Sequence, residues 1–235
     1  MAVTGDGVND VAAIQQADFG IAMGIMGSEL AKDVADLVLL DDNFASIIKG
    51  IEEGRLLFDN LRKSLAYVLS SNFPEAIPFL AYLAVGLPLP LSTVLILLID
   101  SGTDLWPAIS LAYEPAEEAL LKRAPKKNER LVTLNMIAFA YFQIGVIQCL
   151  AGFFAYLVVM GDYGYPPWTL FFMGDSWNNE NVIIGGKGTT FRNQVLAQAQ
   201  SAYFAAIIIV QWTDLLISKT RTDSLFRQGM RYGKN

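Results

Sequence analysis

The sequence predicts a mixed fold, in which a small α/β piece is followed by an α-helical transmembrane bundle of four spans. The chain is 53% hydrophobic over 235 residues, with a mean hydropathy of +0.38, which is too apolar for an ordinary soluble domain. Four stretches reach the roughly 20 mainly apolar residues that cross a bilayer. Residues 1–50, by contrast, alternate short strand and helix patterns typical of a soluble α/β unit.

The α/β piece is expected to hold three strands and two helices before a long helix begins. The expected order is strand Ala2–Thr4, a glycine-rich turn, helix Val11–Ala17, strand Phe19–Met23, helix Glu29–Leu37 capped by Ser28, and strand Val38–Leu40. A further helix is expected to start near Phe44 and to run through residues 51–63 toward the first span, with Gly54 as its one weak point.

The turn at residues 4–10 carries groups suited to phosphate chemistry. It holds two aspartates, an asparagine and two glycines: Asp6, Asp10, Asn9, Gly5 and Gly7. Glycines permit backbone angles and close approaches that a β-carbon would block. Carboxylates are hard ligands of the kind that Mg²⁺ takes beside a phosphate, and the asparagine amide can donate to a phosphoryl oxygen. These are also the usual turn residues, so the loop alone leaves an ordinary strand–turn–helix connection open.

Four apolar stretches are predicted to span the membrane: Ser64–Gly86, Leu91–Tyr113, Met136–Met160 and Ala197–Ile217. Basic residues precede the first stretch, occupy the 114–135 loop and follow the fourth stretch, whereas the 161–196 loop has only Lys187 and Arg192. The positive-inside rule then places both ends and residues 114–135 in the cytoplasm and residues 161–196 outside. The basic residues behind this topology are Arg55, Arg62, Lys63, Lys122, Arg123, Lys126, Lys127, Arg130, Lys219, Arg221, Arg227, Arg231 and Lys234.

Composition excludes several classes of function. The net charge of −6, with no dense basic run, argues against nucleic acid as a partner. The chain has no histidine, which excludes His-based catalysis and His metal ligation. The single Cys149 lies in an apolar stretch, so we expect a small packed side chain and no internal disulfide.

Acidic residues inside the predicted spans need an explanation. They are Glu75, Asp100, Asp104 and Asp214. Each costs about 2.5–3.5 kcal/mol at the centre of a span, and four of them cost on the order of 10 kcal/mol. No Lys or Arg lies away from the span ends to pair with them. Bound cations, protonation or both would compensate; the alternative is neutral acids that hydrogen-bond between helices.

Spacing along the spans favours a cation site. Ser71 and Asn72 share a helical face with Glu75, and Asp100 and Asp104 are four apart around Gly102 and Thr103. Three prolines remove backbone donors, which frees carbonyls and predicts broken helices of the kind that coordinate ions in transporters. The prolines are Pro74, Pro78 and Pro107. The predicted ligands of a hard cation are Ser71, Asn72, Glu75, Asp100, Thr103, Asp104, Gln211 and Asp214.

Several stretches carry a family likeness. The chain resembles P-type cation ATPases of the sodium/potassium-transporting branch at residues 4–10, 17–24, 39–44, 70–75, 99–104, 107–114, 211–214 and 224–230. The likeness covers nearly the whole chain except the 161–196 loop. It implies that residues 1–50 are the C-terminal part of a phosphorylation domain with a HAD-like, Rossmannoid fold. It also implies a stalk helix at 51–63, a hairpin with the cation site at 64–113, a cytoplasmic loop at 114–135, a second pair of spans with an external loop at 136–217, and a cytoplasmic tail at 218–235.

The resemblance implies an ATP-driven pump that exchanges Na⁺ for K⁺ across the cell membrane through a phosphoenzyme. Asp6 and Asp10 would bind Mg²⁺, and Asn9 would position the phosphoryl group. The intramembrane ligands would bind Na⁺ and K⁺, with Asp214 in a further Na⁺ site or a proton path. Ser71 and Asp100 favour the sodium/potassium branch, because the proton/potassium pumps usually carry Lys and Glu at these positions and calcium pumps usually have Asn at the second.

Two departures from the family pattern qualify the resemblance. The phosphorylation motif Asp-Lys-Thr-Gly-Thr, the nucleotide-binding domain and the flanking spans are absent from the sequence, so we expect ATP to be bound mainly by the remainder of a pump chain and this chain alone to be inactive. A β subunit is an implied partner, but residues 188–194 lack the family's Ser-Tyr-Gly-Gln contact. A proton/potassium pump, a sodium-only pump and a truncated non-catalytic membrane protein stay open as alternatives.

Overall fold

The computed structural model describes residues 1–116, 124, 130–177, 179, 184, 186 and 188–220. The chain divides into two compact units, Met1–Leu56 with Ala119–Ala124, and Leu57–Glu118 with Pro125–Asn235. The family-like stretch 224–230 lies outside the described residues. So do many of the basic residues on which the topology prediction rests: Lys122, Arg123, Lys126, Lys127, Lys187, Arg221, Arg227, Arg231 and Lys234.

The first unit is built on a parallel sheet of three strands in the order β1-β2-β3. The elements are β1 Ala2–Gly5, a 3₁₀ turn Val8–Asp10, α1 Val11–Gln16, β2 Phe19–Met23, α2 Glu29–Val34 and β3 Leu37–Leu39. Alternation along β2 separates two small cores, because neighbouring strand residues point to opposite faces. Ala22 packs with Ile14 of α1 and Ala31 of α2, whereas Ile21 and Met23 pack with Leu39.

The second helix is shorter than its sequence pattern predicts. It ends at Val34 rather than Leu37, and Ala35 is already extended. Asp36 is tied to Gly20 twice: its N–H donates to the Gly20 carbonyl at 2.9 Å, and its Oδ2 accepts from the Gly20 N–H at 2.8 Å. Leu37 then pairs with Ile21 in the sheet. Strand pairing therefore takes the residues that the apolar pattern assigned to the helix.

The second unit contains most of each helix that is long and apolar enough to cross a membrane. Across the described residues there are four candidate spans, Phe44–Val85, Thr93–Ala112, Leu134–Asp162 and Thr189–Lys219, and they overlap the four predicted stretches. The first is α3, and the fourth is α10. The second comprises α4 Thr93–Leu98, a π-helical segment Ile99–Asp104 and α5 Leu105–Ala112. The third comprises α6 Leu134–Ala138, a π-helical segment Phe139–Gly145 and α7 Val146–Asp162.

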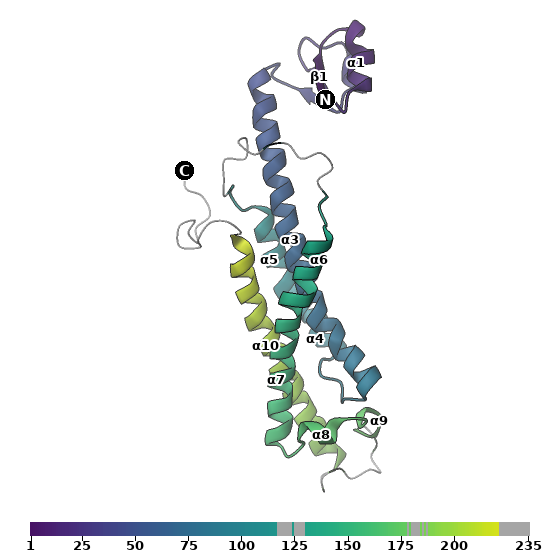
Figure 1. Ribbon diagram of the computed structural model, residues 1–235, viewed down its shortest axis with the longest axis vertical. Coiled ribbons are helices and arrows are strands. Elements are labelled where there is room, and N and C mark those ends of the chain that lie inside the picture. The colour runs from purple at the N-terminus through teal and green to yellow at the C-terminus, as the bar shows by residue number, and fades with distance from the viewer. Residues whose placement is uncertain are drawn as a thin grey trace. The chain divides into compact units, whose positions relative to one another are not determined.

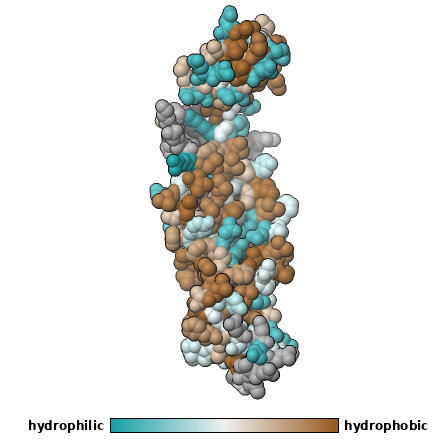
Figure 2. Space-filling model, turned by 90° about the vertical axis from the view of Figure 1, so that its right-hand side faces the viewer, coloured by the Kyte–Doolittle hydropathy of each residue, from teal (hydrophilic) through white to brown (hydrophobic). Residues whose placement is uncertain are grey.

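The helices of this unit are apolar on the outside as well as inside. Figure 2 shows hydrophobic residues over much of the flank of the helical part, and the exposed set includes Leu97, Trp106, Phe142, Phe154 and Ile209. Between the helices, α7 and α10 pack along each other (Figure 1). Two short helices, α8 Pro167–Leu170 and α9 Gly174–Trp177, precede α10, and Trp177 meets the Tyr165 ring at 5.0 Å. An apolar exterior of this kind suits contact with lipid tails.

The predicted helix breaks at the prolines do not occur. Helix α3 continues through Pro74 and Pro78, and Pro107 lies in α5, which follows the π-helical segment of the second span without a break. The second span widens into π geometry over Ile99–Asp104 instead of breaking. Such π segments recur at functional sites, and this one carries two of the predicted ligand carboxylates.

Candidate cation-binding site

Three of the predicted carboxylates lie together. Glu75 comes from α3, and Asp100 and Asp104 come from the π-helical segment of the second span. One oxygen from each lies within 4.8 Å of the other two, with Glu75 and Asp104 buried and Asp100 exposed. Three carboxylates at this separation repel one another when all are ionised, so a cation or protons must neutralise part of the charge.

Hydrogen bonds satisfy one buried carboxylate of this cluster better than the other. The Tyr67 hydroxyl donates to Asp104 Oδ1 at 3.5 Å, and Gln211 Nε2 donates to Asp104 Oδ2 at 3.3 Å. The Thr103 hydroxyl donates to the Ile99 carbonyl at 2.9 Å and makes a longer contact of 3.5 Å with Gln211 Oε1. Glu75 Oε1 is buried and has no hydrogen-bond partner among the described residues. A buried oxygen without a partner costs about 1–3 kcal/mol, and a hard cation beside it would remove that cost.

Ser71 and Asn72 both donate within their own helix, and the Ser71 hydroxyl also lies beside the Asp104 carboxylate. The Ser71 hydroxyl and the Asn72 amide both donate to the Val68 carbonyl, at 3.0 and 2.9 Å. Ser71 is buried, whereas Asn72 is exposed. Each side chain keeps an oxygen that can still accept or ligate, so their role in ion binding stays a prediction.

Asp214 belongs to a different polar cluster. Ser70 Oγ and Gln148 Nε2 donate to its Oδ2 at 2.6 and 3.1 Å, and Ser218 Oγ donates to its Oδ1 at 3.5 Å. The single predicted ligand set therefore separates into two groups, and Gln211, predicted beside Asp214, bonds to Asp104 instead. Whether Asp214 binds an ion or only joins helices through these hydrogen bonds stays open between the two alternatives raised for the intramembrane acids. Gln148 was not predicted as a site residue, although a polar amide inside the apolar third span could have indicated one.

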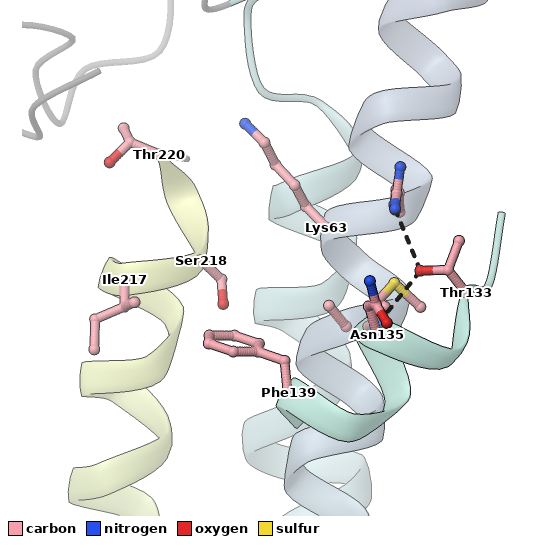
Figure 3. A pocket seen from close by; sticks show the side chains of 10 residues that line it. Lys63, Thr133, Asn135, Phe139, Ile217, Ser218 and Thr220 are labelled. Atoms are coloured by element: carbon pink, nitrogen blue, oxygen red, sulfur yellow. Dashed lines mark hydrogen bonds between the residues drawn. The ribbon is translucent and has the colours of Figure 1, made fainter. Parts of the chain in front are cut away.

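Ser218 also lines a cavity of about 510 Å³ at the end of α10. Figure 3 shows that its lining side chains come from separate helices and that the Phe139 ring reaches toward the helix carrying Ile217 and Ser218. The lining residues are Arg62, Lys63, Ala66, Thr133, Asn135, Met136, Phe139, Ile217, Ser218 and Thr220. Within this group Arg62 Nη2 donates to Thr133 Oγ1 at 3.4 Å. Ser218 therefore contacts both this cavity and the Asp214 carboxylate.

The acidic loop of the first unit forms a second candidate site. Asp6 and Asp10 line a hollow of about 330 Å³ beside Gly5. Asp10 Oδ2 accepts from the backbone N–H groups of Asp6 and Gly7, at 3.3 and 3.1 Å, so one oxygen of Asp10 holds the loop in shape. The other Asp10 oxygen and the Asp6 carboxylate suit Mg²⁺, which commonly takes one or two carboxylates together with phosphate and water oxygens.

The two glycines of this loop differ in importance. A β-carbon on Gly5 would lie 2.5 Å from Asp10 Cβ, which requires a shift of the loop. Gly7 has ordinary extended angles, φ −94° and ψ 165°, and a β-carbon there would make a normal 3.5 Å contact. The close approach that a β-carbon would block therefore occurs at Gly5 and not at Gly7. Asn9 is exposed and is not among the residues that line the hollow.

Asp42 lines the same hollow and was missed by the sequence reasoning. Its carboxylate accepts from the backbone N–H groups of Ile25 and Met26, at 2.9 and 2.7 Å, and its own φ is +49°. The hydrogen bond from Ile25, with that from Met26, holds the pKa of Asp42 below its usual value. Its place in an Asp-Asp-Asn run within a family-like stretch was the available signal.

Apolar helices of membrane-spanning length that carry clustered carboxylates are features of a membrane protein that handles cations. Residues 88–235 match the family described as "Cation transporting ATPase, C-terminus". The chain belongs to this cation-transporting ATPase family.

Individual relatives give the same result. The chain is 53% identical to the sodium/potassium-transporting ATPase subunit alpha-B of Artemia franciscana, over 98% of this chain and 24% of that protein. It is 52% identical to the alpha subunit of Drosophila melanogaster and to the alpha-4 subunit of Homo sapiens, in each case over 98% of this chain and 23% of the relative. The chain therefore spans about a quarter of the length of the curated relatives it matches.

Proposed function

We propose that this chain is part of an ATP-driven pump that exchanges Na⁺ for K⁺ across the cell membrane. The observation that carries the proposal is the cluster of Glu75, Asp100 and Asp104, whose oxygens lie within 4.8 Å of one another. The relatives' printed names, sodium/potassium-transporting ATPase subunits, support this choice of ions. Na⁺ and K⁺ are the transported substrates in this proposal, and Ser71, Asn72, Thr103 and Gln211 complete their ligand set, with Asp214 as a separate Na⁺ or proton position.

The cluster has the properties that reversible ion binding requires. Glu75 Oε1 gains a partner when an ion is bound, whereas Tyr67 and Gln211 hold Asp104 through their hydrogen bonds when it is not. The choice of monovalent cations rests on the relatives' printed names, which refer to sodium and potassium. Helix α3 is uninterrupted from Phe44 to Val85, so a displacement of its early turns would be carried along the helix to Glu75.

The soluble piece completes the proposal. Residues 1–50 are the C-terminal part of a phosphorylation domain with a HAD-like fold, in which Asp6 and Asp10 hold Mg²⁺ and Asn9 positions the phosphoryl group. The bound Mg²⁺ would neutralise charge on the phosphoryl oxygens. ATP and the phosphorylated aspartate belong to other parts of the pump, so this chain alone is inactive. Both ends of the chain are cytoplasmic, residues 161–196 are external, lipid surrounds the spans, and a β subunit is a candidate partner.

The test measures vanadate-sensitive ATPase activity of the full-length protein with Na⁺ and K⁺ varied separately. Glu75→Gln and Asp104→Asn should raise the K⁺ concentration for half-maximal activity by about tenfold, which corresponds to about 1.4 kcal/mol of lost binding. Glu114→Gln is the matched control, because Glu114 is a buried carboxylate paired with Lys219 at 3.0 Å outside the cluster. Absence of K⁺-stimulated dephosphorylation would contradict exchange and favour a sodium-only pump.

A further inference from the structure

A buried tyrosine contacts the backbone next to the carboxylate cluster. Tyr203 of α10 has no exposed surface, and its hydroxyl donates to the Pro74 carbonyl of α3 at 2.7 Å. Pro74 immediately precedes Glu75. A side chain from the fourth span thus holds the backbone that presents a cluster carboxylate of the first span.

The Pro74 carbonyl needs this donor because of the sequence of α3. In an α-helix, a carbonyl accepts from the N–H four residues later. The residue four positions after Pro74 is Pro78, which has no N–H to donate. Both prolines lie inside an uninterrupted helix, so the carbonyl stays within the bundle and needs a partner from elsewhere. Tyr203 supplies it.

The tyrosine ring is enclosed so that its hydroxyl has little freedom. Gly152 of α7 leaves the space for the ring, because a β-carbon there would lie 2.7 Å from Tyr203 Cζ. Phe153, the next residue of α7, meets the ring edge to face with centroids 5.5 Å apart. The ring therefore has the fixed position that a precise hydrogen bond to α3 demands.

We propose that Tyr203 is a positioning residue for ion binding, a role that rests on the proposed function of the cluster. The Pro74 carbonyl and the Glu75 N–H belong to one planar peptide unit. A hydrogen bond to that carbonyl restrains the orientation of this peptide plane, which ends at the Glu75 Cα. It therefore restrains the position of the Glu75 carboxylate relative to Asp100 and Asp104.

The test compares two tyrosine-to-phenylalanine variants of the full-length protein. Tyr203→Phe removes only the hydroxyl and should raise the K⁺ concentration for half-maximal activity about threefold to tenfold, the range expected for one lost hydrogen bond in a membrane bundle. The ATP concentration for half-maximal activity should not change. Tyr156→Phe is the matched control, because the buried Tyr156 hydroxyl donates to the Pro88 carbonyl at 2.8 Å. An unchanged K⁺ response in Tyr203→Phe, or an equal change in both variants, would overturn the proposal.

A second variant tests the role of the proline directly. Pro78→Ala restores an N–H that can reach the Pro74 carbonyl, so Tyr203→Phe should change the K⁺ response less in that background than in the parent. An equal effect in both backgrounds would overturn the positioning role. Glu75→Gln separates this proposal from the proposed function. If Glu75→Gln leaves the K⁺ response unchanged, the cluster is not the ion site and the proposed function fails. If Glu75→Gln changes the K⁺ response strongly and Tyr203→Phe does not change it, only the positioning role fails.

Discussion

The Ser70 hydroxyl of α3 donates to Asp214 Oδ2 of α10 across 2.6 Å, in a buried contact between residues 144 positions apart. Gln148 of the third span donates to the same oxygen at 3.1 Å. One carboxylate thus joins three of the spans. Because the bilayer supplies no water to replace these bonds, the contact should contribute to holding the helices together.

Ser70→Ala should lower the free energy of unfolding by about 0.6–1.7 kcal/mol, the range for hydrogen bonds between membrane helices. Ser201→Ala is the control, since Ser201 is exposed and donates to the Ala197 carbonyl of its own helix. Equilibrium unfolding in mixed micelles measures both. Ser70→Ala and Gln148→Leu should be non-additive because they share one acceptor, and additivity would contradict a common cluster.

Gln211→Leu should weaken ion binding by removing the amide between Asp104 and Thr103. We expect about a tenfold rise in the K⁺ concentration for half-maximal activity of the full-length protein, on the scale of one charged hydrogen bond. Gln200→Leu is matched to it on the same helix, because Gln200 donates to the Leu89 carbonyl at 2.8 Å instead. Similar K⁺ responses in the two variants would argue against a role for Gln211 at the cluster.

Gly5→Ala should abolish phosphoenzyme formation in the full-length protein, whereas Gly7→Ala should largely preserve it. The first adds a β-carbon 2.5 Å from Asp10 Cβ and displaces the carboxylate that holds the loop, while the second makes an ordinary 3.5 Å contact. Phosphorylation from labelled ATP gives the readout. Equal losses in the two variants would show that the close approach at Gly5 is not what matters.

Gly152→Ala should destabilise the bundle by about 1–3 kcal/mol, the cost of overpacking a filled core. The added methyl would meet the Tyr203 ring at 2.7 Å. Gly161→Ala lies on the same helix and meets nothing within 4 Å, so it should be neutral or slightly stabilising. Thermal unfolding in detergent compares the two, and equal melting temperatures would contradict the tight packing of α7 on α10.

The contact of Asp42 with Ile25 and Met26 should weaken in acid. Because folding lowers the pKa of Asp42, its contribution is fully present above the ordinary Asp pKa of about 3.9 and is lost as pH falls through the lowered value. Hydrogen–deuterium exchange, corrected for intrinsic rates, should show the two amides losing protection over that window. Asp42→Asn should remove the pH dependence, and persistence of the dependence in that variant would assign it to another group.

Much of the fold could be predicted from local sequence. The spans follow from runs of apolar residues, and the strand Phe19–Met23 appears where its pattern places it. The end of α2 could not be read locally, because pairing of Leu37 with Ile21 competes with the helix. Continuity of α3 through its prolines was also missed, since a tyrosine 129 residues away satisfies the Pro74 carbonyl.

The sequence by itself determined which residues enter the membrane and which acids are carried there, because insertion depends on the summed transfer free energy of each contiguous stretch. Only the tertiary structure decided how those acids are grouped. The carboxylates of Glu75, Asp100 and Asp104 lie together, and Gln211 donates to Asp104 of this cluster. Asp214 instead accepts a hydrogen bond from Ser70. Grouping depends on the rotation and register of each helix against its neighbours, and side chains far apart in sequence set those through packing and hydrogen bonds.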